Sequence, residues 1–114
     1  MPGREEARSQ QEDKAERRAA REAIAAYYRT ELRKLLEHVR TGFARLDAGD
    51  IDEFELDHLI HHYKRSVAEL WKFCEGRGSA ASAVSALAYR KEQGDEPDWW
   101  DAGTPWRDRP SDSH

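Results

Sequence analysis

The stretch LDAGDIDEFEL at residues 46–56 decides the fold of this chain. Gly49 follows the last residue of an apolar helical pattern, where glycine readily takes the left-handed conformation that ends a helix. Further along, Asp52-x-x-Glu55 forms a capping box, which is typical of the first turn of a new helix. Together the two signals predict a tight turn between two helices.

Apolar residues repeat on both sides of this turn at alternating steps of four and three, the spacing of a helix-packing seam. The seam before the turn contains Tyr28, Leu32, Leu35, Val39 and Leu46, with Gly42 filling its gap. The seam after the turn contains Leu56, Leu59, Ile60, Tyr63, Val67, Leu70, Trp71 and Cys74. Because a short turn joins them, the two seams must face each other. The sequence therefore predicts an all-α fold built on an antiparallel helical hairpin.

Capping residues and glycines give the expected boundaries. Ser9-x-x-Glu12 predicts that the first helix starts near residue 10, after a disordered N-terminus at 1–9. Ser79 and Gly94 flank a third, short helix. We expect a helical domain at 10–93, with helices at about 10–47, 52–75 and 80–93, and an irregular acidic, Trp-rich tail at 94–114.

Composition excludes several classes of protein. The 114 residues carry 37% charged residues and a net charge of -4, which fits a single small domain. No stretch approaches the roughly 20 apolar residues of a membrane span, and the N-terminus is charged where a signal peptide is apolar, so we expect a cytoplasmic protein without a membrane partner. The single cysteine, Cys74, forms no internal disulfide and fits a reducing compartment.

The second predicted helix carries the one pattern that suggests a metal. Glu55-x-x-His58 has the spacing used in di-iron helical bundles, and His62 lies on the same side of the helix. These residues lie opposite the apolar seam, so a divalent transition metal there would need a ligand from another subunit or from the third helix. We therefore favour solvated histidines and no cofactor, with a ferritin-like oligomer as the alternative.

Aromatic residues outside the seam suggest a protein partner. Phe54 and Phe73 fall off the main apolar stripe and need a second cover, either the third helix or another chain. The tail tryptophans Trp99, Trp100 and Trp106 either fold back onto the hairpin, which we favour, or anchor another molecule. These five residues are the candidate partner-binding residues.

The favoured function is a non-enzymatic helical interaction or accessory protein that self-associates or docks on a larger partner. No catalytic residue or small-molecule substrate is evident, because Cys74 lies within the apolar stripe and no serine lies in a Gly-x-Ser-x-Gly turn. Interleaved charges of both signs argue against a nucleic-acid partner. A nucleic-acid-associated regulator stays as an alternative; it would use first-helix arginines, namely Arg17, Arg18, Arg21, Arg29 and Arg33.

Two resemblances accompany these patterns. The order Arg45-Leu46, Gly49-Asp50, Tyr63-x-x-x-Val67, Leu70 and Cys74 resembles the small subunit of bacterial exonuclease VII, although the segment between Gly49 and Tyr63 is longer here. That resemblance implies a helical hairpin acting as a non-catalytic accessory subunit. Separately, the stretch 69–74 (ELWKFC), followed by a glycine loop, an alanine-rich helix and Asp98-Trp99-Trp100, is similar to short uncharacterised helical proteins of actinomycetes, which imply no activity.

Overall fold

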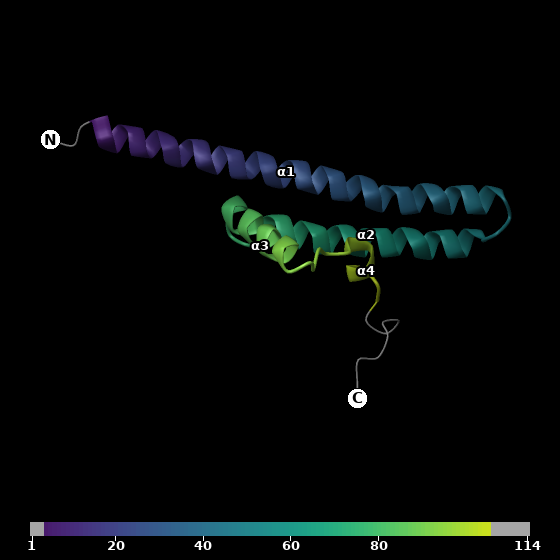
Figure 1. Cartoon of the computed structure of the whole chain (residues 1–114). Coiled ribbons are helices and arrows are strands. Elements are labelled where there is room, and N and C mark those ends of the chain that lie inside the picture. Colours follow the sequence, from purple (N-terminus) through teal and green to yellow (C-terminus); the bar gives the residue numbers. More distant parts are fainter. Residues whose placement is uncertain (1–3, 106–114) are drawn as a thin grey trace.

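The computed structural model describes residues 4–105, which form four helices joined by short connections. In chain order these are α1 (Arg4–Asp47), α2 (Glu53–Glu75), α3 (Ala80–Glu92) and α4 (Trp99–Ala102). Figure 1 shows α1 and α2 running antiparallel from one turn, with α3 and the short α4 beside α2. The described part of the chain contains no strand, which confirms the predicted all-α fold and its antiparallel hairpin.

The turn between α1 and α2 is closed by the residues that the sequence singles out. Gly49 has a φ of 80°, in the left-handed region, and the Asp50 N–H donates to the Arg45 carbonyl at 2.9 Å. The Asp52 carboxylate accepts from the Glu55 N–H at 2.8 Å, and the Glu55 carboxylate accepts from the Asp52 N–H at 3.2 Å. This reciprocal capping box satisfies backbone donors that the first turn of α2 leaves unpaired.

The first helix starts earlier than expected. α1 begins at Arg4, so residues 4–9 are helical and not disordered, and Ser9 lies inside the helix instead of capping it. The physical reason is local, because the run REEAR at residues 4–8 consists of strong helix formers without glycine or proline. A capping box is therefore a possible helix start, which flanking residues of high helix propensity can override.

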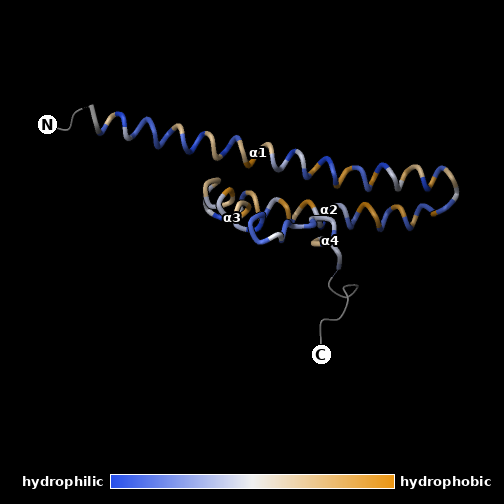
Figure 2. The backbone as a smooth tube through the Cα atoms, viewed as in Figure 1, coloured by the Kyte–Doolittle hydropathy of each residue, from blue (hydrophilic) through white to orange (hydrophobic). Residues whose placement is uncertain are grey.

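The N-terminal part of α1 extends beyond the rest of the molecule. Figure 1 shows it projecting past α2 and α3, and Figure 2 shows that hydrophilic residues dominate it. Residues 6–19, here named the arm, are all exposed, and Ile24 is the first residue of α1 to be buried, at 5% exposure. Helical structure in the arm is therefore maintained mainly by its own turns, with Arg17 reaching the start of α3 near its end.

The core lies where α1, α2, α3 and α4 meet. Its buried members are Ile24, Leu35, Leu70, Phe73, Cys74, Ala83 and Trp99. Toward the turn the two long helices approach closely at Gly42, where an added Cβ would lie 2.9 Å from a Leu56 methyl carbon. Glycine at this position of the seam thus allows α2 to pack directly on the α1 backbone.

The tail after α3 is more regular than expected. The Asp98 carboxylate accepts from the Asp101 N–H at 3.2 Å and caps α4, a single helical turn. Trp99 in this turn is buried at 8% exposure, which confirms that the tail folds back onto the hairpin. The expected irregular segment at 94–105 therefore includes an ordered turn, which the Asp98 cap and the buried Trp99 ring help to fix.

Candidate functional site

The hairpin has two faces, and the tail covers one of them. On this closed face the Trp100 indole lies between two imidazoles, His38 of α1 and His62 of α2. The ring centroids are 4.0 Å and 3.9 Å from the indole, and the interplanar angles are 4° and 6°. Because one imidazole comes from each long helix, this triple stack joins α1, α2 and the tail.

Polar contacts reinforce the closed face. The Trp100 carbonyl lies 2.7 Å from His62 Nε2 and accepts from the Ser66 hydroxyl at 3.1 Å. The Arg65 Nε donates to the Gly103 carbonyl at 2.9 Å. Gly103 packs so tightly on Ser66 that any side chain at this position would overlap it. The segment 100–103 is therefore held by side chains of α2 that lie one turn apart.

Trp99 anchors the same segment in the core. Its indole N–H donates to the Tyr27 hydroxyl at 2.7 Å, and its ring lies 5.2 Å from the Phe73 ring in a tilted arrangement. Burial raises the pKa of Tyr27, while the hydrogen bond from Trp99 acts in the opposite direction. The buried indole is thus packed on two aromatic rings and has its one donor satisfied.

The candidate metal ligands have other roles in this arrangement. The Glu55 carboxylate caps α2, and the His62 imidazole stacks on Trp100 and contacts its carbonyl. His58 lies beside both along an open hollow that Trp100 and Arg65 also line. Within residues 4–105, no group of three or more His, Cys, Asp or Glu side chains is arranged to hold a metal ion. The geometry therefore gives the metal-binding alternative no support.

His62 also corrects the expectation of solvated histidines. The sequence places it opposite the apolar seam, yet in the structure it is half-buried beneath the tail. The tail segment 94–105 supplies a second cover for that side of α2, which the periodicity of α2 alone does not reveal. A tryptophan pair after a short acidic linker, WW at 99–100, is the signal that could have suggested it.

The candidate partner-binding aromatic residues differ in exposure. Phe73 and Trp99 are buried at 6% and 8% exposure, so both belong to the core of this chain and are not available to a partner. Trp100 is half-buried in its histidine stack, and Phe54 is 78% exposed. Trp106 lies outside the described residues. The second cover expected for Phe73 is therefore the chain's own α3 and α4, whereas Phe54 has none among residues 4–105.

The opposite side of the hairpin, here named the open face, carries large apolar side chains that stay exposed. Leu36 and Phe43 of α1 are 46% and 49% exposed, and Trp71 of α2 is 54% exposed. At about 100° per residue, Leu36 points away from His38, two residues on, and Trp71 points away from His62, nine residues back. Trp71 was expected in the buried seam, and this placement corrects that expectation.

Trp71 lies at the edge of its seam for a geometric reason. Leu70, its neighbour in sequence, is fully buried at 0% exposure and points to the centre of the core. The next residue is rotated by about 100°, so both cannot point at the same neighbouring helix. By the same rotation, half-buried Leu32, Ile60 and Val67 lie on the side of Leu36, Phe43 and Trp71, and we name these six residues the apolar strip.

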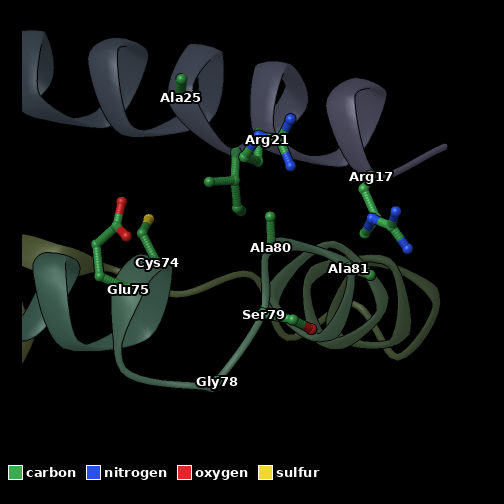
Figure 3. Close-up of a pocket in the computed structure, with 10 residues that line it drawn as sticks. Arg17, Arg21, Ala25, Cys74, Glu75, Gly78, Ser79, Ala80 and Ala81 are labelled. Atoms are coloured by element: carbon green, nitrogen blue, oxygen red, sulfur yellow. The ribbon is translucent and has the colours of Figure 1, made fainter. Parts of the chain in front are cut away.

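A pocket separates the start of α3 from α1. Its lining includes Arg17, Arg21, Cys74, Glu75 and Ala80. Figure 3 shows Arg17 reaching from α1 toward α3 and the Cys74 sulfur pointing toward α1. Burial raises the pKa of Cys74 to about 11, so this cysteine stays a neutral thiol at physiological pH and is a poor nucleophile.

The first-helix arginines do not form one basic stripe. Arg17 and Arg21 line the pocket beside α3, whereas the adjacent Arg18 is rotated by about 100° from Arg17. Arg29 and Arg33 lie farther along α1 and are exposed away from the hairpin seam. Arg17 and Arg21 thus lie on one side of α1 and Arg18, Arg29 and Arg33 on another, where Glu22 interrupts them, so the geometry gives the nucleic-acid alternative no specific support.

Comparison with known proteins adds no relative. No family model matches this chain, and neither the curated proteins nor the solved structures give a significant match. Of the helices within residues 4–105, none has a segment with the length and apolar character needed to cross a membrane. Function is therefore inferred from the two faces of the hairpin.

Proposed function

We propose that this chain is a non-enzymatic helical interaction protein that offers the open face of its hairpin to a protein partner. The observation that carries this proposal is the contrast between the two faces. The closed face is filled by Trp99, Trp100 and Gly103 of the chain's own tail. On the other side Leu36, Phe43 and Trp71 stay about half exposed.

The chemistry of the open face favours a protein over a small ligand. The apolar strip runs along the surface of two antiparallel helices, whereas small-molecule sites are concave pockets. Contiguous exposed apolar surface rimmed by charges is characteristic of protein–protein contact. Large aromatic and aliphatic side chains such as Trp71 also supply most of the binding free energy at such contacts.

Site-specific photocross-linking tests this proposal. A photoreactive amino acid replaces Leu36 on the open face, and a matched variant carries it at Tyr89 of α3, which is 64% exposed. Irradiation is done in cells that naturally encode the chain, and mass spectrometry identifies the cross-linked peptides. We expect defined protein adducts from position 36 that the additional Trp71→Glu substitution abolishes. No adduct at position 36, or equal adducts at both positions, would refute the proposal.

A further inference from the structure

The open face has the dimensions of a second helical hairpin. Its two ends are Phe43, near the turn, and Trp71, near the end of α2. The His38 and His62 rings flank the same indole, so the two residues lie at about the same height along the hairpin axis. Because α1 and α2 are antiparallel, any two residues of these helices whose numbers add to about 100 share a height. On that scale the strip is about 20 Å long at 1.5 Å per residue, and about 20 Å wide across two helices.

The charges along the two edges of the open face differ in sign. Between residues 25 and 47, which lie at the heights of α2 residues 53–75, the exposed charged side chains on the α1 edge are mainly basic and comprise Arg29, Arg33 and Arg40, with one aspartate, Asp47. Those on the α2 edge are mainly acidic and comprise Glu53, Asp57 and Glu75, with one lysine, Lys64. Each set follows from its position on the helix, since Arg29 lies seven residues before Leu36, and Glu75 lies four residues after Trp71.

We propose that a second copy of this chain covers the open face, so that two hairpins form an antiparallel four-helix bundle. This inference rests on the proposed function and names the partner. A two-fold axis parallel to the helices places α1 of one copy over α2 of the other, so the mainly basic edge faces the mainly acidic edge twice. A two-fold axis across the helices would place α1 over α1 and bring arginines together, which the charges disfavour.

Within residues 4–105, the remaining elements leave this arrangement free of obstruction. α3 and α4 pack on the other side of the hairpin, and Pro105, the last described residue, lies beside His58, Arg65 and Trp100. Every neighbouring pair of helices in the proposed bundle is antiparallel, as in up-and-down bundles. Leu36 then lies at the height of the partner's Lys64, between the partner's Ile60 and the partner's Val67.

The heights of the residues along the proposed bundle predict one ion pair between the two copies. Arg40 of one copy lies within about one helical turn of the partner's Asp57. Within its own chain Arg40 contacts Glu37 at 3.3 Å, with both side chains largely exposed, so it is free to reorient. Asp57 contacts His61 at 3.6 Å on an equally exposed surface. The two-fold axis forms this intersubunit pair twice, which makes it a test of the orientation.

Mass measurement with an open-face variant tests the dimer itself. Sedimentation equilibrium of the full chain is expected to give twice the 13.2 kDa chain mass. Leu36→Lys places a charge in the proposed interface at the height of the partner's Lys64, so it should raise the dimer dissociation constant on the order of a hundredfold. Tyr89→Lys, at an exposed aromatic residue of α3, is the control and should leave that constant unchanged. Unaltered helical circular dichroism shows that each variant is folded.

A charge swap tests the orientation. Arg40→Asp and Asp57→Arg should each weaken the dimer about tenfold, and the double variant should recover most of the loss. Two weakened single variants without recovery would overturn the proposed arrangement of α1 over α2.

The dimer and the proposed function fail in different ways. A full chain that stays at 13.2 kDa up to high concentration overturns the dimer, and cross-links from position 36 to a different protein would then still support the function. If the chain dimerises only after residues 106–114 are removed, the proposed dimer of the full chain is also wrong. In that case this segment, and not a second copy of the chain, would cover the open face. A Leu36→Lys variant with an unchanged dissociation constant excludes this face.

Discussion

Removal of the Trp99 side chain should destabilise the protein more than any single change at its surface. An indole presents about 200 Å² of accessible surface, and Trp99 keeps only 8% of its surface exposed. At about 25 cal/mol per Å² the burial contributes up to about 5 kcal/mol. Trp99→Ala retains one carbon of the side chain and leaves a cavity, so we expect the free energy of unfolding to fall by about 3–5 kcal/mol.

A second variant at the same position separates packing from hydrogen bonding. Trp99→Phe keeps an aromatic ring beside Phe73 but loses the N–H that donates to the Tyr27 hydroxyl at 2.7 Å. Loss of that hydrogen bond and part of the ring should reduce the free energy of unfolding by about 1–2 kcal/mol. The smaller loss would show that ring packing is the larger contribution.

Urea unfolding followed by circular dichroism at equal protein concentrations measures these losses. The matched control is Tyr89→Ala, which truncates an aromatic side chain that is 64% exposed and should change the free energy of unfolding by less than about 0.5 kcal/mol. A chain of this length has a total stability of about 6–17 kcal/mol, so the predicted loss is readily measured. If Trp99→Ala cost no more than the control, the tail could not be docked as described.

Three further predictions concern the closed face, the turn and the buried thiol. Gly103→Ala should lower the free energy of unfolding by about 1–3 kcal/mol in thermal melts, because the new methyl group overlaps Ser66; a wild-type melting temperature would contradict that packing. Asp52→Ala removes the α2 cap and should cost about 1 kcal/mol in urea unfolding, whereas no loss would argue against the capping box. Cys74 should react with a thiol reagent at pH 8 far more slowly in the folded protein than in urea. Because folding raises the pKa of Cys74 from 9.0 to about 11, the contribution of its neutral thiol to the free energy of unfolding is complete below pH 9 and declines as the pH rises toward 11. Rapid labelling of Cys74 in the folded protein would contradict its burial.

Local signals in the sequence predict the parts of the fold that depend on neighbouring residues. The Asp52 and Glu55 side chains can cap α2 because both partners lie within one turn of each other. Gly49 is recognisable because only a residue tolerant of positive φ ends the pattern there. The seams around Leu35 and Leu70 are likewise readable, since a 3.6-residue repeat fixes which side of each helix is apolar.

Features that depend on distant contacts are not readable in this way. Phe73 falls outside the hairpin stripe and looks like a partner residue, because periodicity cannot show that α3 and Trp99 return to cover it. Trp71 looks like a core residue because an apolar residue next to Leu70 extends the apolar stripe in the sequence, although in the structure it is 54% exposed. The histidine stack around Trp100 joins residues from three segments, and no spacing rule predicts such a meeting.

The arm of α1 differs in local stability from the rest of the same helix. Residues 6–19 have no buried side chain, so their helix can unwind turn by turn without opening the core, whereas the part from Ile24 onward unfolds only together with α2 and α3. Amide protons of the arm should therefore exchange with solvent orders of magnitude faster than those of the same helix around Leu35. One continuous helix thus contains a segment that unfolds locally and a segment that unfolds only with the core, and the boundary between them lies near Ile24.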